Sequence, residues 1–225
     1  MNEQQNPHIL SHYETALSSA LTQTISLAEE TVTLLHFAQI AVIERQEAPA
    51  NKIIASIPIM EDAVREITHA TRHILQQFHP LAGDLRFVLA LTRCVDRLHE
   101  SNLDLAQIAK GAKNIIALPR HDIPKELSAI FEMASSELSK AIQSVQTHDT
   151  DLARRVRLSD KQLDIKHKEL ISTLIKEVSE KKCEVTTGLQ LIFIVRTIER
   201  IGDHAKAIAA SAIFEADAQE VRHLK

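Results

Sequence analysis

The sequence has few of the residues that β-rich folds require. Its 225 residues include only 4 glycines and 6 prolines, and sheets joined by tight turns need more of both. Tryptophan is absent, and aromatic residues make up only 3% of the chain. Hydrophobic residues nevertheless reach 44%, so the core must consist of Leu, Ile, Val and Ala. This composition predicts an all-α fold.

Other absences exclude whole classes of protein. The two cysteines, Cys94 and Cys183, form no CxxC pair or disulfide framework, which is typical of a reducing compartment. The net charge of -4, with acids and bases interleaved, argues against a nucleic-acid surface, which would show a basic stripe. The polar residues 1–12 are no signal peptide, and the most apolar stretch, 189–195, is too short to span a bilayer. We therefore expect a cytoplasmic protein with no transmembrane segment and no nucleic-acid partner.

Clusters of helix breakers divide the chain into six helices. The predicted helices are 13–47, 52–78, 84–116, 125–146, 151–178 and 185–215. The turns between them repeat at a constant offset of 100 residues, because 48–50 matches 148–150 and 79–83 matches 179–183. The apolar positions of the third helices agree at the same offset, for example Leu91 with Leu191.

This repeat predicts two tandem three-helix bundles in an elongated six-helix protein. A third helix of about 30 residues would be ~45 Å long. The predicted segments are a flexible N-terminus (1–12), a first unit (13–116), a linker (117–124), a second unit (125–215) and a C-terminal tail (216–225).

The most informative residues lie in the last predicted helix. Glu199 and Asp203 are four residues apart and share one helix face beside the apolar stripe. Gly202 lies between them at a stripe position, where it lowers helix propensity by ~1 kcal/mol relative to alanine. A glycine at that position indicates a close approach by another helix. Two carboxylates at this spacing repel, so a cation or a basic side chain should compensate them.

A second carboxylate pair is predicted to face the first. If the chain turns back near Lys181, Asp160 lies level with position 202 and Asp164 with position 198. Four carboxylates then converge, and hard cations and iron accept such oxygen ligands. We predict a site for a divalent or ferric ion, Fe, Mn, Zn or Mg, at Glu199, Asp203, Asp160 and Asp164. The alternative is a solvated acidic patch beside basic side chains, namely Arg157, Lys161 and Arg200.

At an offset of 100, the first unit lacks this site. The matching residues are Met60, Val64, His99 and Leu103, of which three are apolar. We expect those three to be buried with no metal among them. A nearby acidic row, Asp96, Glu100 and Asp104, is displaced by one residue, or about 100° around the helix, and is interpreted as a solvated face.

Several segments resemble the PhoU family of bacterial phosphate-uptake regulators. The segment 196–205, containing Ile-Glu-Arg-Ile-Gly-Asp at 198–203, resembles the family signature that recurs in the third helix of each repeat. Pro-Leu-Ala-Gly-Asp-Leu-Arg at 80–86 resembles the matching start of the first repeat's third helix. Two shorter segments, 159–164 and 221–223, resemble the family's Asp-Lys segment and its C-terminal ending.

The resemblance implies two three-helix bundles, metal held by ExxxD helices, frequent homodimers and no enzymatic activity. It also implies partners, a phosphate ABC transporter and a sensor histidine kinase, and repression of phosphate-starvation genes. Glu199 and Asp203 are then the second-repeat metal ligands, supported by Asp160 and Asp164. The first repeat departs from the signature, since Glu100 and Asn102 stand where Arg and Gly are expected.

Two other functions are compatible with the residues alone. A carboxylate-bridged metal bundle could act as an oxidase or a phosphohydrolase, and a metal-free helical protein could serve only as an interaction module. Turnover of O₂ or phosphoesters would indicate the enzyme, whereas recovery with membrane transport components would indicate the regulator.

Overall fold

The computed structural model describes residues 7–218, and for 7–10, 160 and 161 it describes the backbone only. This part of the chain forms six α-helices and contains no strand. The helices are α1 (Pro7–Ile43), α2 (Glu47–Phe78), α3 (Ala82–Ala117), α4 (Glu126–Gln146), α5 (Thr150–Ser179) and α6 (Val185–Asp217). The predicted all-α class is confirmed. Of the predicted flexible termini, residues 1–6 and 219–225 lie outside the described residues, and α1 already begins at Pro7.

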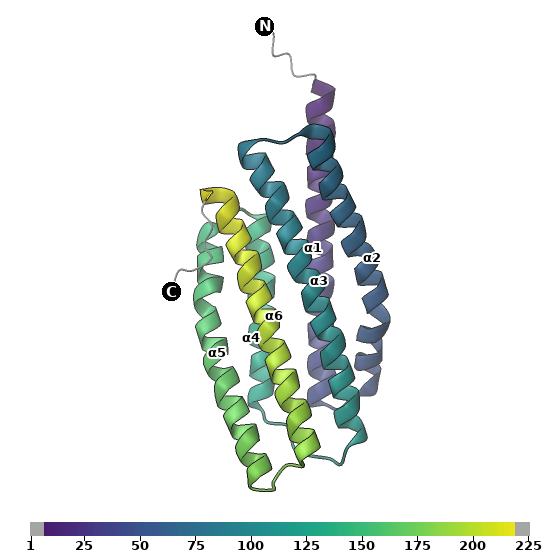
Figure 1. The fold of residues 1–225 in the computed structure, drawn as a ribbon, viewed down its shortest axis with the longest axis vertical. Coiled ribbons are helices and arrows are strands. Elements are labelled where there is room, and N and C mark those ends of the chain that lie inside the picture. The colour runs from purple at the N-terminus through teal and green to yellow at the C-terminus, as the bar shows by residue number, and fades with distance from the viewer. Residues whose placement is uncertain (1–6, 219–225) are drawn as a thin grey trace.

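Successive helices run antiparallel and build two bundles that lie side by side (Figure 1). One bundle consists of α1, α2 and α3, and the other of α4, α5 and α6. The bundles meet where α3 packs against α6 and α1 packs against α4, whereas α2 and α5 lie on opposite outer sides. All six helices follow the long axis, so the molecule is elongated, as predicted.

The burial pattern shows how the two bundles correspond. Buried residues of α3 recur on α6 100 positions later, for example Leu91 and Leu98 with Leu191 and Ile198. Buried residues of the first two helices recur 103 positions later. These pairs include Leu27 with Ile130, Leu35 with Leu138, Ala38 with Ala141, Ala50 with Ala153, Ile53 with Val156 and Met60 with Leu163. The offset of 100 is therefore right for the third helices and wrong for the first two.

The physical reason lies in the first turn. The prediction placed a turn at 48–50 because Pro49 breaks helices, but the turn lies at 44–46 and matches 147–149. Pro49 belongs to the first turn of α2, where backbone N–H groups have no intrahelical acceptor and a proline costs little.

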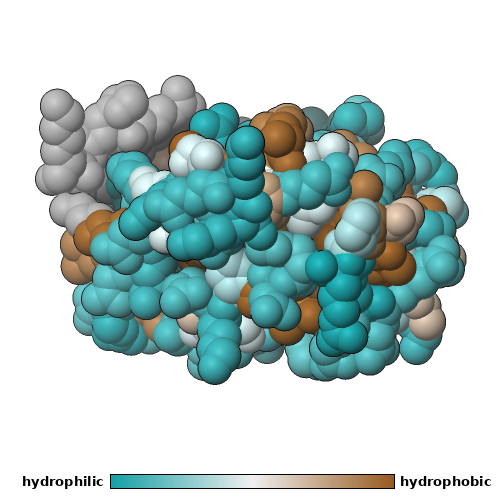
Figure 2. Space-filling model, turned by 90° about the horizontal axis from the view of Figure 1, so that it is seen from below, coloured by the Kyte–Doolittle hydropathy of each residue, from teal (hydrophilic) through white to brown (hydrophobic). Residues whose placement is uncertain are grey.

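The lower end of the molecule carries the turns at 44–46, 118–125 and 180–184. Seen from below, this end is mostly hydrophilic, with apolar side chains in small separate patches (Figure 2). Within residues 7–218, no helix combines the length and the apolar character that crossing a membrane requires.

Both cysteines are buried and neither forms a disulfide. Burial raises the pKa of the Cys94 thiol to about 12 and also raises the pKa of Cys183. Because the thiolate is the reactive form, we expect Cys94, inside α3, to react with a disulfide reagent at least about tenfold more slowly than Cys183, beside the α5–α6 turn. Mass spectrometry of the labelled native protein measures both rates, with a Cys183→Ser variant as control. Equal labelling rates for Cys94 and Cys183 would contradict the expectation that the α5–α6 turn opens more readily than the interior of α3.

Candidate functional site

The predicted metal ligands occupy adjoining parts of α5 and α6. Glu199 is half-buried, whereas Asp203 is exposed and lies 3.7 Å from the Lys206 ammonium. Asp164 is half-buried on α5, and the side chain of Asp160 lies outside the described residues. Among the side chains that the structure describes, no three of His, Cys, Asp and Glu lie close enough together to hold a metal ion. The fold thus brings the two helices together without gathering the described carboxylates into one cluster.

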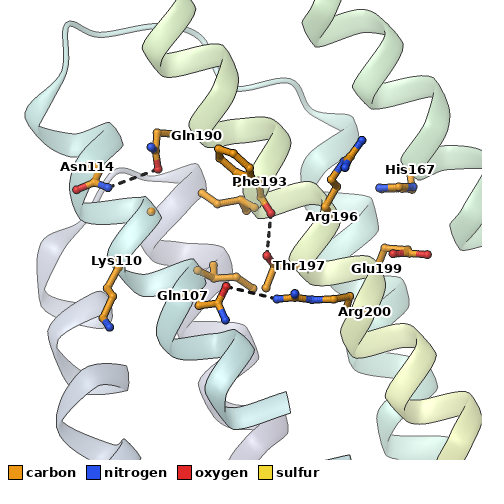
Figure 3. Close-up of a pocket in the computed structure, with 13 residues that line it drawn as sticks. Gln107, Lys110, Asn114, His167, Gln190, Phe193, Arg196, Thr197, Glu199 and Arg200 are labelled. Carbon is orange, nitrogen blue, oxygen red and sulfur yellow. Dashed lines mark hydrogen bonds between the residues drawn. The ribbon is translucent and has the colours of Figure 1, made fainter. Parts of the chain in front are cut away.

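Gly202 marks the close approach that the sequence predicts. A Cβ atom added to it would lie 2.4 Å from Cδ2 of Leu163, so the glycine is required for the contact between α5 and α6. Among the described side chains, Leu163 lies directly against Gly202. His167, one helical turn further along α5, lines the same groove as Glu199 (Figure 3).

A further carboxylate, Glu137 on α4, reaches this region and escaped the sequence prediction. It is only 4% exposed, and its Oε2 lies 3.5 Å from the position that a Gly202 Cβ would take. The signal was present in the sequence, because Ile130, Ala134, Glu137 and Ala141 follow the spacing of one buried helix face. A glutamate inside an apolar stripe indicates a functional or paired carboxylate, since burying a lone charge is costly.

His167 stays neutral near pH 7. Burial lowers its pKa, and the nearby Arg196 adds to this effect while Asp164 opposes it. Its Nε2 atom is buried and has no hydrogen-bond partner among the described residues. The imidazole therefore offers a polar atom toward α6 without adding charge.

A groove of about 700 Å³ runs over the outer surface of α3 and α6 (Figure 3). We call it the α3–α6 groove. Its polar and aromatic lining on the α3 side consists of Gln107, Lys110, Asn114, Gln190, Phe193 and Arg200, and on the α5 side of His167, Arg196 and Glu199. A volume of this size is typical of small-molecule sites.

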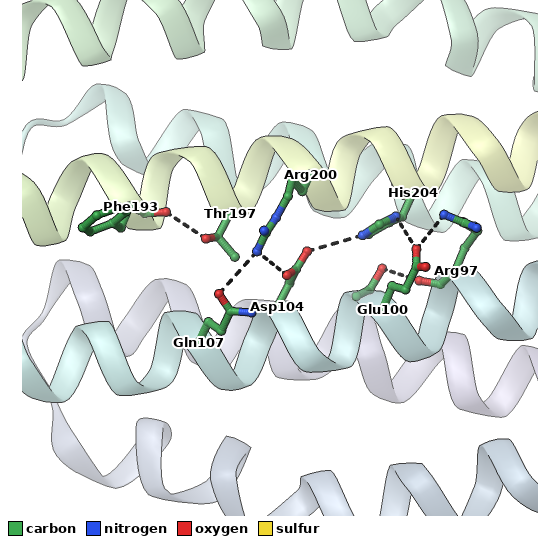
Figure 4. Close-up of polar contacts among 9 residues, drawn as sticks. Arg97, Glu100, Asp104, Gln107, Phe193, Thr197, Arg200 and His204 are labelled. Carbon is green, nitrogen blue, oxygen red and sulfur yellow. Dashed lines mark hydrogen bonds and ion pairs between the residues drawn. The ribbon is translucent and has the colours of Figure 1, made fainter.

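Beside the groove, on the side away from the turns at 118–125 and 180–184, polar contacts join α3 to α6 (Figure 4). Asp104, whose side chain is 8% exposed, accepts a hydrogen bond from Arg200, and Arg200 also donates to Gln107 at 3.4 Å. The Nε2 atom of His204 lies 3.3 Å from Asp104 Oδ2, and its Nδ1 atom lies 3.4 Å from Glu100 Oε2. The interpretation of the acidic row as a solvated face is therefore wrong for Asp104 and Glu100, because both face basic residues of the second bundle.

The charges in this network follow the duplication. At the offset of 100, Glu100 corresponds to Arg200 and Asp104 to His204. The contacts of Glu100 with His204 and of Asp104 with Arg200 are thus equivalent under exchange of the two bundles. Both positions are acidic on α3 and basic on α6, so the two copies have diverged into complementary faces.

Comparisons with known proteins agree with this architecture. The PhoU domain family model matches residues 127–212. A phosphate-specific transport system accessory protein PhoU homolog from Xylella fastidiosa is 27% identical over 95% of this chain and 89% of its own length. The corresponding protein from Rhizobium meliloti is 29% identical over 93% of this chain and 89% of its own length. Residues 127–212 thus match a PhoU domain, and the chain resembles PhoU homologs over almost its full length. The crystal structure of PhoU from Pseudomonas aeruginosa has the same fold, with a TM-score of 0.87, 22% identity and coverage of 92% of this chain and all of that one.

The PhoU signature of α6 has no counterpart on α3. His99 and Leu103 occupy the positions of Glu199 and Asp203. The expected burial is confirmed for Met60, whereas Val64 is half-buried and Leu103 is 40% exposed. The prediction for Leu103 is wrong because the core-facing residue at this level is Asn102, and one residue along a helix turns about 100° away.

The corrected register also changes the equivalents on α2. With an offset of 103, Asp160 and Asp164 correspond to Ile57 and Glu61. Glu137 on α4 corresponds to Leu34 on α1, which is fully buried. The first repeat thus has an aliphatic side chain in place of the buried carboxylate, and the two repeats are built differently at this level.

Proposed function

We propose that this PhoU-family protein acts by binding, as a cytoplasmic regulator that links a phosphate ABC transporter to a sensor histidine kinase and has no catalytic activity of its own. The observation that carries this proposal is the full-length similarity to phosphate-specific transport system accessory proteins, which spans 95% of this chain. The packing of the two bundles supports it as well, because contacts between α3 and α6 favour a fixed arrangement of the long outer helix faces, which partners could bind.

Affinity purification tests the partner proposal. The tagged chain, isolated from its own host grown with ample phosphate, is expected to retain the transporter's ATPase subunit and the kinase, and its deletion is expected to derepress phosphate-starvation genes. The same purification and a size measurement test the proposed homodimer. Turnover of phosphoesters or O₂ by the pure protein, without partner recovery, would instead favour a metal-dependent enzyme.

We further propose a carboxylate metal site in the second repeat, formed by Glu199, Asp203, Asp160 and Asp164. Two observations support it: the glycine-mediated approach of α5 to α6, and Glu137, whose buried carboxylate lies against the same glycine. Oxygen donors of this kind suit iron, manganese or magnesium, and carboxylates also bind zinc. A cation bound near Glu137 would join α4, α5 and α6.

Elemental analysis tests the metal site. The wild-type chain, incubated with Fe, Mn, Zn or Mg and then desalted, is expected to retain metal, whereas a Glu199→Ala/Asp203→Ala variant is expected to lose it. Metal at a hundredfold excess over its Kd should stabilise the wild type by ~2.7 kcal/mol. An Asp62→Ala/Glu66→Ala variant is the matched control, because these two carboxylates have the same spacing but are exposed on α2. Equal metal content in all three proteins would contradict the site.

A further inference from the structure

The α3–α6 groove concentrates positive charge on a chain that is acidic as a whole. Three cations line it, Lys110, Arg196 and Arg200, against one carboxylate, Glu199. The whole chain has a net charge of -4. Lys110 and Arg196 have no ion-pair partner among the residues that the structure describes, and both are exposed. Lys110 lines the groove on its α3 side and Arg196 on its α5 side, so an anion bound between them would meet positive charge from both sides.

Arg200 is held in position for such a ligand. Its Nη2 atom is fixed by Asp104 and Gln107, while Nε and Nη1 have no partner in the described part of the chain. The side chain remains 49% exposed. The guanidinium therefore presents a free edge to the groove in a preset orientation, and such edges bind phosphate oxygens well.

The other groove residues suit a flat polar ring. Phe193 is 59% exposed in a protein that has only 6 phenylalanines and no tryptophan, and its ring lies at the groove (Figure 3). Around it lie the amides of Asn114 and Gln190, which are 3.5 Å apart and come from different helices. Amide side chains both donate and accept hydrogen bonds, so they can pair with the donors and acceptors on the edge of a nucleobase. Phe193 and Arg200 are seven residues apart, about 10 Å along α6.

We propose that the α3–α6 groove binds a nucleoside di- or triphosphate, with the base on Phe193 and the phosphates on Lys110, Arg196 and Arg200. Neutral His167 lies beside Arg196 and adds no charge to the site. This site uses side chains other than the proposed metal ligands, apart from Glu199 at its edge. It goes beyond the proposed regulatory function and does not depend on it.

Calorimetric titration of the full chain in EDTA tests the proposal, because the chelator removes any contribution from the carboxylate site. ATP is expected to bind once per chain, adenosine far more weakly, and tripolyphosphate more weakly than ATP. Phe193→Ala should weaken the binding of ATP about tenfold and leave the binding of tripolyphosphate unchanged. Lys110→Gln and Arg196→Gln should each weaken the binding of both ligands about tenfold, and this loss of affinity should be smaller at high salt.

Matched controls separate local from general effects. Lys140→Gln removes an exposed lysine on α4, and Ile165→Ala truncates a 57% exposed side chain on α5. Neither should change ATP affinity, and all variants should melt like the wild type because every altered side chain is exposed. Absence of saturable ATP binding, equal binding of tripolyphosphate and ATP, or unchanged affinity in Phe193→Ala and Lys110→Gln would each overturn the proposal.

Discussion

Replacing Gly202 with valine is expected to lower the free energy of unfolding by about 3 kcal/mol. The new Cβ would lie 2.4 Å from Leu163 Cδ2, and its two methyl groups would extend further toward α5. Leu163 is fully buried, so it cannot swing into solvent to make room. The better helix propensity of valine returns only a few tenths of a kcal/mol. Urea unfolding followed by circular dichroism measures the loss.

Gly83→Val is the matched control. Gly83 lies in the first turn of α3, where an added Cβ would meet only Arg86 Nη2 at 3.9 Å. Its substitution should change stability by no more than about 0.5 kcal/mol. A Leu163→Ala background adds a second check, because removing the obstructing methyl groups should reduce the cost of Gly202→Val by about 1 kcal/mol or more. Equal stabilities of Gly202→Val and Gly83→Val would mean that α5 and α6 are not in close contact.

The fold was predictable because its main signals are local. Low glycine and proline content indicated helices, and apolar spacing on the third helices gave their correspondence at 100 residues. The first turn was misplaced because Pro49 breaks a helix interior but not a first helical turn. That error shifted the predicted correspondence between α2 and α5 by three residues. The aspartates of α5 were therefore matched with Met60 and Val64, whereas their equivalents in the structure are Ile57 and Glu61.

The candidate site was only partly predictable, since its partners come from distant segments. The signature residues of α6 and the close approach at Gly202 could be read from one helix. The role of Asp104 could not, because Arg200 lies 96 residues further along the chain, and helix periodicity does not say which faces meet across two bundles. Glu137 needed the position of α4 relative to α6, which no local pattern contains.

The complementary charges of α3 and α6 favour one pairing of the repeats over others. Two copies of an ancestral third helix would present the same face to each other, and two α6 faces would oppose Arg200 with a second arginine of the same charge. Acids on α3 and bases on α6 favour the contact within one chain and disfavour α3–α3 and α6–α6 contacts between chains. The departure of Glu100 from the PhoU signature is therefore explained by its contact with His204.

Removing Asp104 should show how strongly this network holds the bundles together. Asp104→Ala is expected to lower the free energy of unfolding by about 2 kcal/mol, less than the 3–5 kcal/mol typical of a broken buried pair. The reduction follows from exposure, because Asp104 is 8% exposed but Arg200 is 49% exposed and can be hydrated. Asp96→Ala is the matched control, since it makes the same change in helix propensity on the exposed side of α3 and should cost no more than about 0.5 kcal/mol.

A double-mutant cycle with Arg200→Ala assigns the loss to the contact between the bundles. If the ion pair carries the effect, the double variant should be more stable than the sum of the single losses predicts, by about 1 kcal/mol or more. The coupling should persist at high salt for the buried carboxylate, although pairs at the surface are screened. Additive losses would mean that Asp104 stabilises α3 by itself, and the complementary faces would then not be what joins the two repeats.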